Sequence, residues 1–260
     1  MKLILALILS LPAYLSYAQE NAVLPLKQNS VSVTIGHNQF KDENLHPKVF
    51  RGMIIGSSFL HTRITKNISE YSAGFKISLL NNTYEDFPSA ANILILGNYR
   101  YLFSLVRTEK LEYFLGPVAD LQWGTSLYFN WDESHMYYAN YLSGGVGNRI
   151  RYKTGDKTIN FNLDIPIISC ISRPVNNRQY KIDDMTFVGI VKNLSSNPEV
   201  VLPDKNLYVN AGLEMNYLNK RKRIRSVGYN FRYHFMQASN GNPYHNIENA
   251  ISYKFIFNHE

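Results

Sequence analysis

Beyond its first residues, the chain has no long apolar run. After residue 18 the longest apolar stretches are short pieces such as Ile93–Leu96, whereas a membrane-spanning helix needs about 20 apolar residues. Heptad repeats, long amphipathic helical patterns and low-complexity linkers are also missing. The chain holds one cysteine, Cys170, so an internal disulfide cannot form. These absences exclude a helical membrane protein, a coiled coil and a disulfide-stabilised scaffold.

Residues 1–18 have the pattern of an export signal. Lys2 supplies a positive start, Leu3–Leu11 a short apolar core, and Ser16–Ala18 a small-x-small cleavage site. We therefore expect a cleaved signal peptide over 1–18 and one exported domain over 19–260. No cysteine stands near the cleavage site, so a lipoprotein anchor is not expected.

Aromatic residues and basic charge are both plentiful. Aromatic residues make up 13% of the chain, and tyrosine alone occurs 19 times. Tyrosine is favoured at membrane–water interfaces, where its hydroxyl contacts water and its ring contacts the apolar phase. Without Lys2, 26 basic residues stand against 20 acidic ones, a net charge of +6. That charge suits anionic neighbours such as phosphorylated lipid headgroups, although it also serves ordinary solubility.

Two segments within the last 35 residues alternate between apolar and polar positions. Every odd position from Val227 to Phe235 is apolar or aromatic, and the positions between them are Gly228, Asn230, Arg232 and His234. A second alternating run covers 251–257. Side chains of a β-strand point to opposite faces with period two. One apolar and one polar face are typical of a membrane β-barrel strand, with lipid outside and a polar lumen inside.

Eight further segments alternate in the same way, which gives ten predicted strands. Together with the two segments described above, the ten predicted strands lie approximately at 31–35, 52–64, 71–79, 91–103, 111–127, 138–152, 159–167, 207–217, 227–235 and 251–257. The segment Met185–Val191 could form an extra strand, so twelve strands remain an alternative to ten.

The connections between these segments fall into two alternating classes. Short ones lie near residues 66, 108, 155 and 220, and longer polar ones lie near 39–48, 81–89, 130–135, 170–204 and 238–246. Outer-membrane barrels have short periplasmic turns and longer external loops. We therefore predict an all-β, antiparallel up-and-down transmembrane β-barrel in a bacterial outer membrane, with the N-terminus in the periplasm. The alternative is a soluble secreted β-sandwich, whose strands also alternate.

The stretch Arg232–Gly241 resembles the end of the lipid A 3-O-deacylase and outer-membrane phospholipase A signatures. Both families carry His-x-Ser-Asn near the outer end of a strand. The resemblance implies that Ser239 is a nucleophile at the external rim, beside acyl ester bonds. Strand parity places Gln237 and Ser239 on the lipid side, and Asn240 follows them at the rim.

The same stretch departs from those signatures at the position of the catalytic base. Gln237 occupies the position of the histidine, and a neutral amide cannot accept a serine proton. His245, in the same hairpin loop, is the candidate base, and Glu248 or Asn249 could orient it. The alternative is that Ser239–Gly241 is ordinary turn sequence.

Charged residues occupy several positions predicted to face the lumen. A ten-stranded barrel is narrow, because eight strands leave room only for side chains or one small ligand. We therefore expect a lumen largely plugged by a charged hydrogen-bonded network, with a narrow path for a small solute as the alternative. The predicted lumen residues are Lys76, Asp164, Glu214, Arg232 and Lys254.

Three functions remain open at this point. They are a structural or surface-binding outer-membrane barrel, an acyl-ester hydrolase that acts on lipid A or phospholipid, and a narrow small-solute channel. No cofactor and no metal site are predicted, since His37, His46 and His61 are scattered. The predicted partner is outer-membrane lipid, including lipopolysaccharide. Nucleic acid is not expected, because the basic run 219–225 has no accompanying stacking motif.

Overall fold

The computed structural model describes residues 26–43, 48–82, 88–129, 136–173, 198–219, 223–239 and 241–259. These residues form strands, and none of their segments is a helix long and apolar enough to cross a membrane. The strands are β1 (Leu26–Asp42), β2 (Val49–Ile64), β3 (Ile68–Asn81), β4 (Ala90–Arg107), β5 (Leu111–Tyr128), β6 (Met136–Tyr138), β7 (Asn140–Thr154), β8 (Lys157–Ser172), β9 (Pro198–Val201), β10 (Asn206–Leu218), β11 (Ile224–Met236) and β12 (Tyr244–His259).

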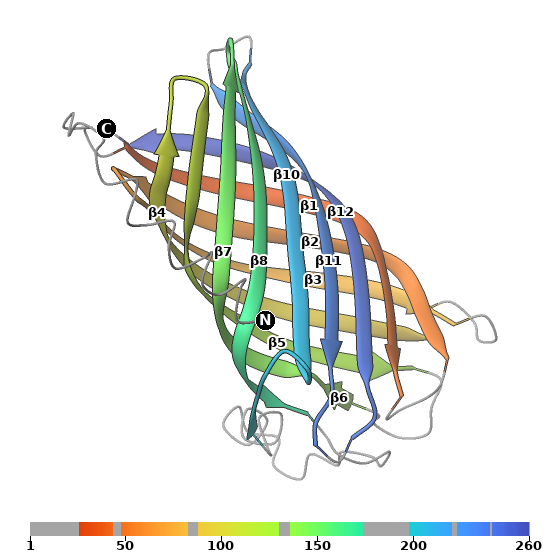
Figure 1. Cartoon of the computed structure of the whole chain (residues 1–260). Helices are drawn as coiled ribbons and strands as arrows, with labels where there is room; N and C mark the ends of the chain where they lie inside the picture. The colour runs from red at the N-terminus through yellow and green to blue at the C-terminus, as the bar shows by residue number, and fades with distance from the viewer. Residues whose placement is uncertain are drawn as a thin grey trace.

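Ten long strands close into one antiparallel barrel (Figure 1). Each pairs with the next long strand in the sequence, so that β5 pairs with β7 and β8 with β10, and β12 returns to pair with β1 from Lys27 to Asp42. The short strands β6 and β9 lie beside β5 and β8. The ten-strand prediction is therefore confirmed. The predicted signal peptide and the segment Met185–Val191 lie outside the described residues.

The outer and inner faces follow the alternation of the sequence. On β1, Val31, Val33 and Ile35 are exposed on the outer face, while Ser32 and Thr34 are buried inside. The same pattern runs around the barrel, so its outer surface is a belt of apolar side chains. A register shift between β7 and β8 interrupts the pattern. As a result Ile167 and Ile168 are both exposed, where strict alternation predicts only the first.

An apolar layer fills the barrel at the end that carries the long connections. We call it the mouth layer. Phe40 stacks on Phe50 with ring centroids 5.4 Å apart, and Tyr128 meets Phe50 edge-on at 5.3 Å. All three rings are buried. The mouth layer consists of Phe40, Phe50, Leu80, Ala90, Tyr128, Tyr137, Ala139, Tyr141, Ile171, Val201, Tyr208, Met236, Ala238 and Tyr244.

The opposite end, which carries the short turns, has a smaller apolar core. A small apolar cluster of Ile64, Ile68, Leu102 and Phe114 lies there. The turn between β7 and β8 needs a left-handed backbone, and Gly155 supplies it with φ of 54°. Between the two ends the interior is polar.

Candidate functional site

The middle of the barrel is crossed by a charged network. Arg149 of β7 donates two hydrogen bonds of 2.6 Å to the carboxylate of Glu70 on β3. Glu70 also accepts one from Thr62 at 3.0 Å and lies 3.7 Å from Arg100. Glu70 is only 2% exposed. A carboxylate so deeply buried is tolerable because it is paired and hydrogen-bonded.

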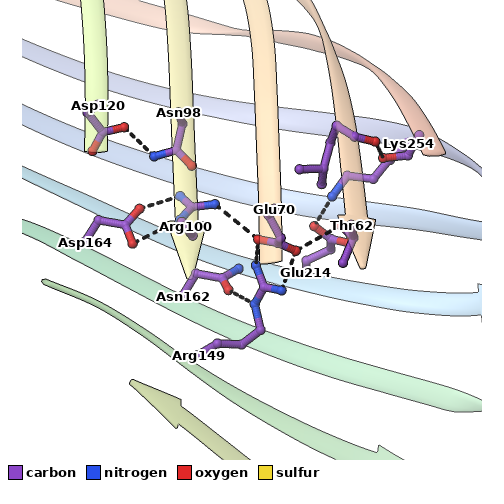
Figure 2. A network of polar contacts seen from close by, with 12 residues as sticks. Thr62, Glu70, Asn98, Arg100, Asp120, Arg149, Asn162, Asp164, Glu214 and Lys254 are labelled. Carbon is purple, nitrogen blue, oxygen red and sulfur yellow. Dashed lines mark hydrogen bonds and ion pairs between the residues drawn. The ribbon is translucent and has the colours of Figure 1, made fainter. Parts of the chain in front are cut away.

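The network continues towards the mouth layer. Arg100 of β4 is ion-paired with Asp164 of β8, and Asp120 accepts hydrogen bonds from Asn98 and from the hydroxyl of Tyr208. Figure 2 shows the side chains of β3, β4, β7 and β8 meeting across the lumen. Strands that are not neighbours in the barrel are therefore tied together by contacts inside the lumen.

The five predicted lumen residues all lie on the inner face. Lys76 is ion-paired with Glu248, and Lys254 donates to Glu214 at 2.6 Å. Asp164 is paired as described above. Arg232 donates to Gln122 at 2.7 Å and to the hydroxyl of Tyr141. Each charge thus has a partner on another strand.

Two cavities lined by the described residues lie in the polar interior. The larger, of about 270 Å³, extends beside Lys76, Asp164 and Arg232, and the smaller, of about 50 Å³, lies towards the turn end. Arg149 and Lys254 line both cavities. Arg149 thus lies where the two cavities meet, and its partner Glu70 lines the smaller one.

Arg173 spans the interior at the long-connection end. Its side chain is fully buried, and its guanidinium donates to the carboxylate of Asp42 at 2.5 Å. The same group donates to the carbonyl oxygens of Met236 and Asn242 at 3.0 and 2.6 Å. It also lies 5.8 Å from the ring centroid of Tyr244. Arg173 therefore ties the end of β8 to β1 and to the β11–β12 connection, directly above the mouth layer.

Ser239 lies at the exposed rim, in the connection that follows β11. Its hydroxyl donates to the carboxylate of Glu199 on β9 and accepts a hydrogen bond of 2.7 Å from Lys205. Its backbone N–H donates to the same carboxylate at 2.8 Å. These hydrogen bonds from Ser239 hold the pKa of Glu199 below its ordinary value. We call the three residues the rim clasp.

The structure does not assemble the predicted set of Ser239, His245 and Glu248. His245 lies on the outer face, where its Nδ1 faces the hydroxyl of Tyr233 at 3.4 Å. Glu248 lies on the inner face and pairs with Lys76. Glu248 lies three positions after His245 in β12, and side chains an odd number of positions apart along a strand point to opposite faces. The structure therefore does not place the Glu248 carboxylate beside the His245 imidazole.

The other two predicted rim residues have different outcomes. Strand β11 ends at Met236, so strand parity does not continue to Gln237. The Gln237 side chain is half-buried and donates to the carbonyl of Gly241 at 3.2 Å, which braces the loop instead of facing lipid. Asn240 lies outside the described residues. Within the described ranges, no three His, Cys, Asp or Glu side chains gather as metal ligands would.

Sequence reasoning missed three central residues. Glu70 and Arg149 sit at inward positions of their strands, and the alternation would have found both: Glu70 directly precedes the segment 71–79, and Arg149 lies within 138–152. Arg173 follows the end of β8, where no periodicity applies. Its role depends on hydrogen bonds to Asp42, Met236 and Asn242, which lie in distant parts of the sequence.

No family model matches the chain, and no curated protein matches it. Among solved structures it is similar to the outer-membrane protease OmpT from Escherichia coli. The TM-score is 0.50 at 9% identity, over 93% of this chain and 99% of that one. The translocator domain of the autotransporter NalP from Neisseria meningitidis reaches a TM-score of only 0.37 at 9% identity, over 98% and 95%. At such low identity the likeness to OmpT concerns the fold alone: a closed antiparallel barrel of the outer-membrane type.

Proposed function

We propose that this chain is a non-conducting barrel of the bacterial outer membrane, with a structural or surface-binding role at its outer rim. The apolar outer belt supports a membrane location, because only a lipid surround makes so much exposed apolar surface favourable. OmpT, whose fold it shares, is named an outer-membrane protein. Aromatic side chains gather on the outer face towards the turn end, as a membrane-interface girdle does. They are Phe59, Tyr71, Tyr99, Phe103, Tyr152, Tyr253 and Phe257.

The mouth layer is the observation that carries the non-conducting assignment. It places buried aromatic rings across the lumen, and Arg173 crosses the interior above it. The Glu70–Arg149 pair lies in the lumen on the other side of the larger cavity. An ion that crossed the barrel would have to pass an apolar layer, where its hydration shell is lost. The rim is then the part of the protein that can meet a partner or a lipid.

Conductance in planar bilayers tests this proposal. We expect no current steps from the purified barrel. The matched positive control is the triple variant Phe40→Ala, Phe50→Ala and Arg173→Ala, which removes two rings of the mouth layer and the group above it. We expect this variant to give current steps. Steps of the same size from the unmodified barrel would overturn the proposal and favour a small-solute channel.

The hydrolase hypothesis finds no matching geometry among the described residues. The Ser239 hydroxyl contacts a carboxylate and an ammonium group, while the imidazole of His245 faces Tyr233. A carboxylate with a lowered pKa is a weak base, and a protonated amine cannot accept a proton. We therefore propose a structural role for Ser239 as a member of the rim clasp.

A further inference from the structure

One sector of the outer surface, at the end with the long connections, is basic instead of apolar. It consists of Lys41 and His37 on β1, Arg51 on β2 and His245 on β12, and we call it the rim patch. All four stand at odd positions, which face outwards on these strands. On β4, β7 and β8, exposed outward side chains near this end are aliphatic: Ile93 on β4, Leu142 on β7, and Ile167 and Ile168 on β8.

The strand register brings the four basic side chains together. His245 lies directly opposite Lys41. Arg51 lies directly opposite Gln39, which makes it a diagonal neighbour of both Lys41 and His37. Directly opposite residues have Cβ atoms about 5 Å apart, and diagonal neighbours lie about 7–8 Å apart. Long basic side chains at these positions can converge on one anionic group.

The positive charge of the rim patch is only partly compensated by the described residues. Glu43 lies 2.6 Å from Lys41. The hydrogen bond from Lys41, together with the positive charges of Lys41 and His245, holds the pKa of Glu43 below its ordinary value. Arg51 is exposed and has no ion pair with a described residue. Neighbouring like charges on a sheet oppose each other, so a bound anion would stabilise this surface.

The surroundings of the rim patch favour a lipid over a free anion. On the same strands, Ile35, Met53 and Ile55 continue the outer face towards the middle of the barrel and are more than half exposed. The ring of Phe235 lies 5.2 Å from that of His245. A ligand with its phosphate on the basic groups could therefore lay its acyl chains along these apolar side chains.

We propose that the rim patch binds the phosphate of a phosphorylated lipid headgroup in the outer leaflet. This inference rests on the membrane location given under Proposed function, since only there does the patch meet lipid. Lys41 and Arg51 supply the charge, and His245 adds a hydrogen-bond donor from the neighbouring strand. The register of three strands makes this site, which spans the seam where β12 closes onto β1.

The test is native mass spectrometry of the purified full-length barrel in detergent, titrated with lipid A that carries two phosphates. The variant is Lys41→Gln with Arg51→Gln. The matched control is Lys27→Gln with Arg63→Gln, because that exposed basic pair lies on the outer face of the same two strands at the turn end. Two lost contacts of about 1 kcal/mol each correspond to roughly thirtyfold weaker binding. We expect that loss in the variant and a change below about twofold in the control.

Additional titrations and a charge-conserving variant distinguish the possible outcomes. Dephosphorylated lipid A should bind the unmodified barrel as weakly as the variant binds the phosphorylated form, and inorganic phosphate alone should not compete. The exchange Lys41→Arg with Arg51→Lys keeps the charges and should keep the affinity, which shows that a loss is not a folding defect. Equal losses in variant and control would overturn the inference, as would competition by free phosphate. Conductance of the unmodified barrel would overturn the proposed function and leave this site intact.

Discussion

At the end with the long connections the barrel interior is filled by stacked aromatic rings, whereas the middle of the barrel is held by ion pairs. The mouth layer is held by the packing of its rings, and ring packing tolerates small rearrangements. The Glu70–Arg149 centre instead depends on fixed geometry, since each buried charge needs its partner. The same barrel therefore contains one region whose stability depends on packed volume and another whose stability depends on ion pairing.

The largest effect is expected when the volume of the mouth layer is reduced. Phe40→Ala combined with Phe50→Ala removes two stacked rings that are each 1% exposed. Each buried Phe→Ala change costs about 3–5 kcal/mol of folding stability, so the double variant should unfold at much lower denaturant. Urea unfolding of the vesicle-inserted barrel, followed by tryptophan fluorescence, measures this.

Phe75→Ala is the control for that experiment. Phe75 lies on the lipid-facing side of β3 and is 52% exposed, so lipid can fill the space that its ring leaves. We expect a clearly smaller loss of stability. An equal loss per ring would mean that the mouth layer is not a packed core.

The contribution of the Glu70–Arg149 ion pair is tested by Arg149→Ala. This change leaves Glu70 buried with fewer partners, and breaking a buried ion pair costs about 3–5 kcal/mol. The double variant Arg149→Met with Glu70→Leu removes both charges and should recover most of that stability in the same urea assay. If the double variant is as unstable as Arg149→Ala, then packing around these side chains, and not their charge, holds the middle of the barrel.

The smallest effect is expected at the rim clasp. Ser239→Ala removes one hydroxyl from an exposed hydrogen-bonded group, which we expect to cost less than about 1 kcal/mol. Neither the unmodified barrel nor the variant should release an acyl chain from lipid A or phospholipid, as followed by mass spectrometry. Acyl release by the unmodified barrel alone would restore the hydrolase hypothesis.

The rim clasp also has a defined pH dependence. The pKa of Glu199 is lower in the folded barrel than in the unfolded chain. Its contribution is therefore present above the unfolded pKa and is lost as pH falls through the folded pKa. The stability difference between the unmodified barrel and Ser239→Ala should accordingly vanish in acid.

The period-two pattern determined the barrel, its ten strands and the face of every predicted lumen residue, because strand geometry converts sequence parity directly into inside and outside. This relation between sequence parity and face holds only within the strands. Gln237 and Arg173 both follow a strand, and their positions depend on contacts between distant segments.

Only the closed barrel decided which charges meet. Glu70 finds Arg149 across the lumen, 79 positions away in the sequence, and His245 meets Lys41 because β12 closes onto β1. Periodicity assigns each side chain to a face, but it does not fix strand register or the distance across the lumen. Those two quantities come from barrel closure, and they turn a pattern of polar positions into one network inside and one basic patch outside.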